Sequence, residues 1–357
     1  MNWKTIVTLS VIGLFSLTSC DKEEEPDETA DFDKKSLLAN LSDNLILPSL
    51  NQFKTDLIAL SSGVDQLDEN TSQSELDEVR SAWKTAYLTW QTVKIFDFGP
   101  IRMNAFKSAT GTYPVDTSDV NNNIASGSYV LGTAGNADAI GLPALDFLFY
   151  KSAALDEIKT NANYRAYIQD VVNKMKNETD LVLSGWDSYV SEFKEATGTT
   201  STSGFSFFIN EFNRDYELAK NAKVGIPLGK QSLGIQQPEF IEARYSGISF
   251  ELLEESIAAL QKVYKGNSFE NDEEGIGCDD YLIHLDRSTL ANTIDGNFTD
   301  IKNKVAGFDE TFESAMFNNS QECDELYLML QQHTVNIKTD MTSAFGVLIT
   351  YQDNDGD

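Results

Sequence analysis

The side chains that could do chemistry in this chain are few and widely spaced. The sequence has two histidines, His284 and His333, and three cysteines, Cys20, Cys278 and Cys323. A zinc hydrolase needs about three protein ligands and a base near an activated water. The sequence has no His-Glu-x-x-His helix, no Gly-x-Ser-x-Gly turn and no glycine-rich phosphate loop. Motifs of these kinds therefore give no argument for an enzyme.

One acidic residue has a distinctive setting, within the segment Gly141-Leu142-Pro143-Ala144-Leu145-Asp146. A stretch rich in Gly, Asn and Asp precedes the segment, and the apolar run 147–150 follows it. Positions 143 and 146 are one helical turn apart, so their side chains point the same way. Such a pair can share a metal or a polar ligand, but Pro143 offers no ligand atom. Asp146 alone provides too few ligands for tight metal binding.

This segment resembles the Gly-x-His-x-x-Glu signature of the imelysin-like family, with Pro143 at the His position and Asp146 at the Glu position. Other segments resemble further landmarks of the family, in the family's order: 44–48, 83–90, 96–100, Tyr113-Pro114, 121–124, Pro238-Glu239 and 243–247. Many members carry an acid just before the segment that matches 96–100, and here that position is Lys94. The resemblance makes six residues candidates for a ligand pocket: Lys94, Asp97, Tyr113, Gly141, Pro143 and Asp146.

The resemblance also implies a fold and a function. It implies an all-α protein of two bundle-like halves, 34–230 and 231–357, with the functional cleft between them near the signature segment 141–150. It implies a non-catalytic binding protein associated with the uptake of iron or another nutrient, whose partner is a small ligand or a protein of an uptake system. The alternatives are a metal-dependent peptidase of the imelysin type and a surface scaffold. The altered signature favours a polar organic ligand or a protein partner over a metal, so we assign no cofactor, no catalytic residue and no metal site beyond Asp146 as a weak candidate.

The elements that must position these residues are predicted to be helices. Apolar residues recur at helical spacing through most of the chain, and alternating strand patterns are rare. Trp83, Tyr87 and Trp90 share one helical face, which favours a buried seam over the wall of a pocket. Residues 107–140 are predicted to be a long loop, either one wall of the cleft or an ordered surface excursion. The Gly/Pro-containing segment 223–230 predicts the junction between the halves.

The first residues of the chain predict a lipid anchor. Lys4, the apolar run 6–17 and Leu17-Thr18-Ser19-Cys20 form a lipoprotein signal peptide, 1–20, with Cys20 as the lipidated residue. The apolar run is shorter than the roughly 20 residues that cross a bilayer. An acidic tether, 21–33, follows and is predicted to be disordered. Its first residues resemble an export tag, and a chance match in a solvated linker fits them equally well. We expect an outer-membrane lipoprotein whose periplasmic or surface orientation is open.

Composition argues against a nucleic-acid partner and does not decide whether a disulfide forms. A net charge of −29 argues against nucleic acid, because phosphate binding relies on Lys/Arg clusters. Cys278 and Cys323 form an even pair in an exported chain, and a disulfide between them is as compatible with the sequence as two free thiols. His333 lies on an apolar stripe and is predicted to be a hydrogen-bonded core residue. The acidic tail 352–357 begins like a calcium loop but lacks its downstream Glu, which does not favour calcium.

Overall fold

The computed structural model describes residues 31–351. The chain divides into two units, 1–32 and 33–357, and the account below concerns the second. The predicted signal peptide with Cys20, most of the acidic tether and the tail 352–357 lie outside the described residues. All regular elements within 31–351 are helical, which confirms the all-α prediction.

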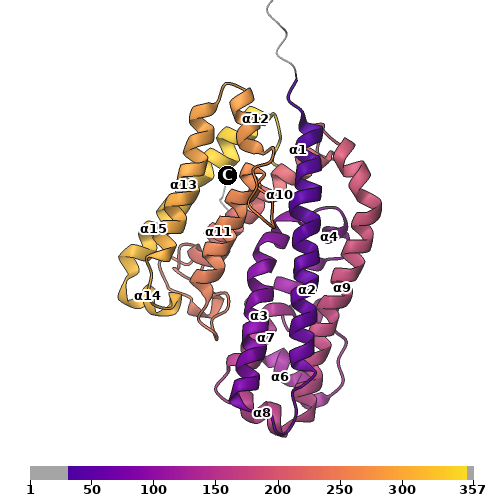
Figure 1. Cartoon of the computed structure of the whole chain (residues 1–357). Coiled ribbons are helices and arrows are strands. Elements are labelled where there is room, and N and C mark those ends of the chain that lie inside the picture. The colour runs from indigo at the N-terminus through magenta and orange to yellow at the C-terminus, as the bar shows by residue number, and fades with distance from the viewer. Residues whose placement is uncertain (1–30, 352–357) are drawn as a thin grey trace, which may run out of the picture. The chain divides into compact units, whose positions relative to one another are not determined.

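Three long helices form the first group of packed elements: α2 (Leu47–Val64), α3 (Gln73–Val93) and α9 (Ala162–Glu195). α2 packs against both α3 and α9, and Figure 1 shows the three running side by side. Pro48 lies in the first turn of α2, where its missing N–H is not needed. Ser72 and Glu75 form a capping box at the start of α3. The chain enters α2 through α1 (Lys34–Asn40) and the π-helix η1 (Leu41–Ile46).

Short helices connect α3 to α9, and this stretch contains the signature segment and three other landmarks, 96–100, Tyr113-Pro114 and 121–124. In chain order they are η2 (Lys94–Phe96), α4 (Pro100–Met103), α5 (Phe106–Gly111), α6 (Thr117–Ser126), η3 (Ala134–Asn136), α7 (Gly141–Tyr150) and α8 (Ala154–Thr160).

The prediction of a long loop over 107–140 is therefore wrong for much of that region. Asp116 caps α6 by accepting hydrogen bonds from the N–H groups of Ser118 (2.8 Å) and Asp119 (3.0 Å). Val120 and Ile124, four residues apart, are both buried. Two apolar residues and a cap are enough to hold this short helix against its neighbours, and they were too few to give a visible helical period.

The second group of helices follows α9. Its elements are α10 (Gly204–Leu218), the π-helix η4 (Ala219–Gly225), η5 (Pro238–Phe240), α11 (Ser249–Lys265), α12 (Cys278–His284), α13 (Ser288–Ala306), α14 (Phe312–Asn318), α15 (Ser320–Thr334), the π-helix η6 (Val335–Met341) and α16 (Thr342–Phe345). α11 packs against α13 and also against α3, which joins the two groups (Figure 1). The boundary at 230 between two predicted halves stays a prediction.

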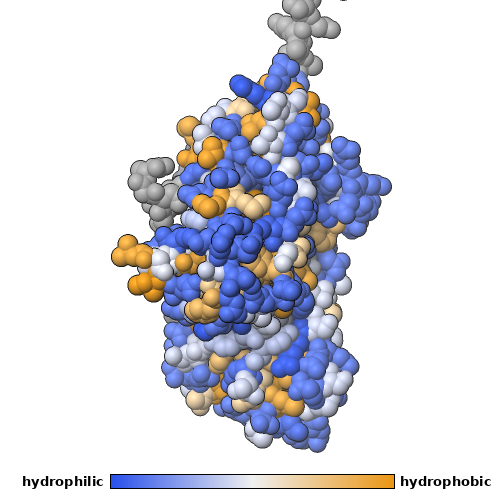
Figure 2. Space-filling model, turned by 90° about the vertical axis from the view of Figure 1, so that its left-hand side faces the viewer, coloured by the Kyte–Doolittle hydropathy of each residue, from blue (hydrophilic) through white to orange (hydrophobic). Residues whose placement is uncertain are grey.

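The core is rich in aromatic side chains, and the surface is largely polar. Trp83, Tyr87 and Trp90 of α3 are at most 2% exposed, as a buried seam requires. Figure 2 shows a mostly hydrophilic face with small scattered apolar groups and one that projects at its left edge. Between residues 31 and 351, no helix combines the length and the apolar character that a membrane span needs.

The two cysteines of this unit are not bonded to each other. Cys278 in α12 and Cys323 in α15 are both buried free thiols, so the disulfide that the sequence left open is absent. Even cysteine counts reflect the compartment, whereas bonding also requires that the two Cα atoms approach within about 7 Å.

His333 has the surroundings of a core histidine. Its ring is 1% exposed, packs edge-to-face against Tyr216 and Phe298, and lies 3.2 Å from the amide nitrogen of Asn297. Burial lowers the pKa of His333 to about 4, so the ring is neutral at neutral pH.

Candidate functional site

The signature helix α7 is held in place by its first residue. Gly141 has φ +80°, and a Cβ at this position would lie 2.4 Å from the backbone oxygen of Thr110 in α5. Only glycine allows this backbone conformation together with so close an approach. Every α7 residue from Gly141 to Phe149 is buried. Gly141 therefore acts by seating α7 against α5.

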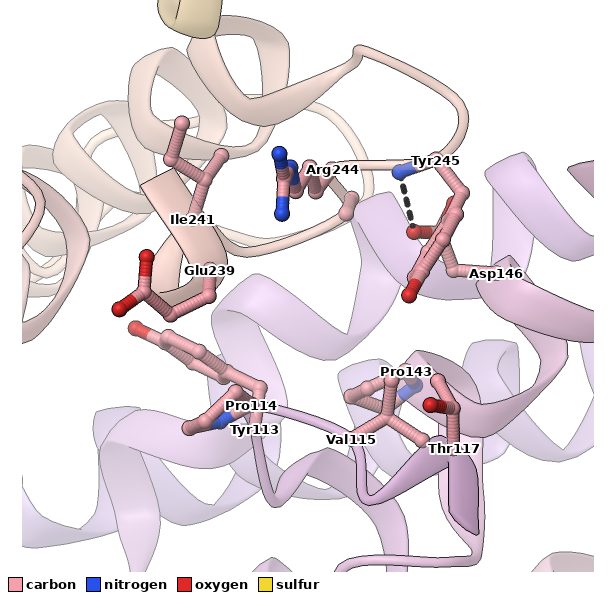
Figure 3. Close-up of a pocket in the computed structure, with 11 residues that line it drawn as sticks. Tyr113, Pro114, Val115, Thr117, Pro143, Asp146, Glu239, Ile241, Arg244 and Tyr245 are labelled. Carbon is pink, nitrogen blue, oxygen red and sulfur yellow. Dashed lines mark hydrogen bonds between the residues drawn. The ribbon is translucent and has the colours of Figure 1, made fainter. Parts of the chain in front are cut away.

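Asp146 joins α7 to the segment that precedes α11. Its two carboxylate oxygens accept hydrogen bonds from the backbone N–H groups of Tyr245 (2.9 Å) and Ser246 (3.0 Å), and the first of these is drawn in Figure 3. The side chain of Phe147 packs against the Tyr245 ring at 5.1 Å. Asp146 is 2% exposed. Burial raises the pKa of Asp146 to about 6, although the hydrogen bonds from Ser246 and Tyr245 oppose the rise.

These residues border a cavity of about 260 Å³, which we call the signature pocket. Its lining consists of Tyr113, Pro114, Val115, Thr117, Pro143, Asp146, Glu239, Ile241, Ala243, Arg244 and Tyr245. In Figure 3 Tyr113, Pro143 and Thr117 face Glu239, Ile241 and Arg244 across this space. Arg244 is fixed by a two-point ion pair with Glu313 (2.9 and 2.7 Å). The pocket thus combines apolar and aromatic walls with a few fixed polar groups.

The signature pocket does not fit a transition metal. Pro143 has no ligand atom, and both oxygens of Asp146 already accept backbone hydrogen bonds. Among residues 31–351, no group of three or more His, Cys, Asp or Glu side chains is arranged to hold a metal ion. A site for such an ion needs several converging ligands, whereas this pocket has only two carboxylates, Asp146 and Glu239, and Asp146 is already engaged.

The other predicted site residues lie around a separate cavity of about 310 Å³, which we call the second pocket. Lys94 and Asp97 line it, and Tyr113 lines both pockets. The full lining is Trp90, Lys94, Asp97, Lys107, Ser108, Gly111, Thr112, Tyr113, Arg214, Asp215, Leu218, Ala222, Lys223 and Glu242. The six candidates were thus predicted as one site, but the structure distributes five of them over two pockets and gives Gly141 a packing role.

Lys94 lies in a buried ion-pair cluster in the second pocket. Its ammonium group donates to Asp215 Oδ2 (2.5 Å) and to Ser256 Oγ (3.0 Å), and Lys107 donates to Asp215 Oδ1 (3.1 Å). Burial lowers the pKa of Lys94 to about 8, against the opposing effect of Asp215. Burial alone would raise the pKa of Asp215, but Lys94 and Lys107 outweigh it and hold that pKa at about 2. Both Lys94 and Asp215 are therefore charged at neutral pH.

Glu242 provides an electrostatic link between the two pockets. It is 3% exposed, accepts a hydrogen bond from the Tyr87 hydroxyl (3.0 Å) and forms a buried ion pair with Lys223. After burial, the negative charge of Glu242 is the main influence that raises the pKa of Tyr113. Glu242 also adds to the rise in the pKa of Asp146.

Sequence reasoning did not identify Asp215, Glu242, Lys107 or Lys223 as site residues. The partners of Asp215 lie 121 and 108 residues away in the chain, and sequence spacing says nothing about such pairs. A weak signal was available in α10, where acidic residues stand among the buried aromatic ones instead of on a separate face. A fully buried acid requires a partner.

The helical fold and the altered signature define an imelysin-like protein. The sequence profile of the Imelysin family matches residues 46–337. The chain belongs to this family, which confirms the resemblance seen in its sequence.

Two solved structures have the same fold. One is a putative iron-regulated protein A precursor from Parabacteroides distasonis ATCC 8503, with a TM-score of 0.75 and 15% identity over 88% of this chain and 95% of that one. The other is an imelysin-like protein from Psychrobacter arcticum 273-4, with a TM-score of 0.72 and 18% identity over 89% and 97% of the two chains. No curated protein sequence matched this chain.

Proposed function

We propose that this protein is a non-catalytic binding lipoprotein of the cell envelope. It is anchored in the outer membrane through Cys20 and captures a polar organic molecule in the signature pocket for a nutrient-uptake system. The family and the name of the iron-regulated neighbour support the link to uptake of iron or another nutrient. The ligand is an organic molecule and not a bare metal ion, because the pocket presents too few ligand atoms for a metal.

The observation that carries this proposal is the state of Asp146. Both carboxylate oxygens are engaged by backbone N–H groups, so this side chain positions one wall of the pocket. The neighbouring walls are aromatic, proline and aliphatic side chains with the fixed guanidinium of Arg244 among them. Thr117 and Glu239 also line the pocket, and this mixture of apolar walls and polar groups suits a polar organic molecule. Nothing in residues 31–351 favours the peptidase alternative.

Binding is tested by native mass spectrometry of the full chain purified from its own envelope fraction. The comparison is with Thr117→Trp, which fills the signature pocket from a half-buried position in the first turn of α6. We expect an adduct of one small mass on the wild type that is absent from the variant. An adduct retained by Thr117→Trp, or a wild type without any adduct, contradicts the proposed site.

The anchor is tested separately by metabolic labelling with palmitate. The wild-type chain should take up the label and partition with membranes. Cys20→Ser should lose both properties, because two or more acyl chains are what hold such a protein on a bilayer. Equal labelling of the two chains contradicts the proposed anchor without affecting the test of binding.

A further inference from the structure

We propose that the second pocket is a binding site of its own for a small molecule that carries a carboxylate or phosphate group. The inference goes beyond the proposed function, because it assigns a ligand class to a cavity other than the signature pocket. It is based on the charge of the lining, on two unpartnered hydrogen-bond donors and on the shape of the walls.

The lining of the second pocket carries an excess of positive charge in a strongly acidic chain. The chain has a net charge of −29. Its second pocket nevertheless is lined by four basic side chains and three carboxylates: Lys94, Lys107, Arg214 and Lys223 with Asp97, Asp215 and Glu242. A fourth carboxylate, Glu211, contacts Arg214 (3.4 Å) from outside the lining. The nearby ammonium groups of Lys223 and Lys107 both disfavour the charged form of Lys94. One bound anion would neutralise the excess and relieve this repulsion.

Trp90 directs an unused donor toward this cavity. The residue is 2% exposed and lines the pocket, and within residues 31–351 its indole N–H has no hydrogen-bond partner. A Cβ at Gly111 would lie 2.5 Å from the indole nitrogen. The absence of a side chain at Gly111 therefore leaves the N–H uncovered. An indole N–H only donates, so its partner must supply an acceptor.

The hydroxyl of Tyr113 is a second unused donor. It too has no hydrogen-bond partner in the described part of the chain, although Glu242 and Asp215 are close enough to raise the pKa of Tyr113. Tyr113 is half-buried and lines the cavity, so its hydroxyl is available to a bound molecule. A carboxylate or phosphate oxygen would accept from Tyr113 and Trp90 while it faces the ammonium of Lys107.

The remaining walls favour an organic molecule of modest size. Leu218 and Ala222 add apolar surface to the lining beside Trp90 and Tyr113. The volume of about 310 Å³ lies at the small end of the range for ligand pockets. Ala222 and Lys223 come from the π-helix η4, and π-helical segments occur frequently at functional sites.

The test measures binding of three probes to the full chain in mild detergent: inorganic phosphate, citrate and benzoate. Thermal shifts are recorded at constant ionic strength maintained with chloride, and the three probes distinguish an inorganic from an organic source of the anion. Lys107→Gln removes one cation of the pocket, Tyr113→Phe one unused hydroxyl and Trp90→Phe one unused N–H. We expect at least one probe to stabilise the wild type, and each substitution to weaken that probe about tenfold, as for the loss of one hydrogen bond to a charged group.

Two controls make the result decisive. Lys54→Gln removes the same charge from an exposed lysine that pairs with Asp180 on the surface, and it should leave the response unchanged. Asp146→Ala alters the signature pocket and should also retain the response. The proposal is overturned if no probe stabilises the wild type, if Lys54→Gln weakens the response as much as Lys107→Gln does, or if Asp146→Ala abolishes it.

Discussion

Asp215→Asn tests the charge cluster of the second pocket most sharply. The substitution keeps the shape of a fully buried side chain and removes the negative charge that Lys94 and Lys107 share. The pKa of Asp215 is about 2 in the folded protein, against an ordinary value of 3.8. This difference corresponds to about 2 kcal/mol of stability at neutral pH.

The sign of the pH dependence follows from the direction of this shift. Because folding lowers the pKa of Asp215, its contribution is present above about pH 4 and is lost as the pH falls toward 2. Wild type should therefore exceed Asp215→Asn in free energy of unfolding by about 2 kcal/mol at pH 7, or roughly 3 °C in Tm. The difference should shrink toward zero near pH 2.

Urea unfolding followed by far-ultraviolet circular dichroism across this pH range measures the difference directly. Asp187→Asn, at an exposed position of α9, is the matched control because it changes the net charge equally. The reasoning is refuted if Asp215→Asn is no less stable than the control at pH 7. A large loss that does not vary with pH also contradicts it, since that would indicate a packing defect.

Three further predictions concern the signature helix and the cysteines. Burial raises the pKa of Asp146 to about 6, so the free energy of unfolding of the wild type should fall by up to about 3 kcal/mol as the pH rises from about 4 to 6. In urea unfolding, Asp146→Ala should not show this fall. A variant with the same pH profile as the wild type would contradict the prediction. Gly141→Ala should destabilise the fold by about 2–4 kcal/mol, because Gly141 has a positive φ and a Cβ there would meet a backbone oxygen. At the control position Gly296, a Cβ would meet no atom within 4 Å. Calorimetry should therefore show Gly296→Ala to be neutral or slightly stabilising. Cys278 and Cys323 are free thiols, so a thiol count in urea without reductant should find one thiol fewer in Cys278→Ala than in the wild type. If the two cysteines formed a disulfide, the variant would instead show one thiol more than the wild type, because Cys323 would be released.

The sequence carried enough information to predict the fold class and to single out a segment that borders a pocket. The spacing of Trp83, Tyr87 and Trp90 marks one buried face of a helix, and the segment from Gly141 to Asp146 lies at the signature pocket. Helical periodicity is a local property, so it can be read from one stretch of chain. A short helix such as α6 has too few apolar residues to show this periodicity, so it cannot be predicted in this way.

The division of the candidates into two pockets could not be predicted in this way. It depends on Asp215 meeting Lys94 across 121 residues, and on Tyr113 standing between the pockets. Such pairs are fixed by how helices pack, and a buried ion pair places no constraint on residues near it in sequence. The engagement of Asp146 by backbone N–H groups was equally invisible, because backbone donors leave no trace in residue types.

Metal binding to wild type and Asp146→Ala tests the central claim most directly. The claim is that the altered signature positions an organic-ligand pocket and holds no metal. The purified full chain is assayed for bound metal and for thermal shifts with iron, zinc, copper and calcium. We predict that no transition metal stabilises either protein. A transition metal that stabilises the wild type and loses its effect in Asp146→Ala would contradict this account, because Asp146 would then be a ligand.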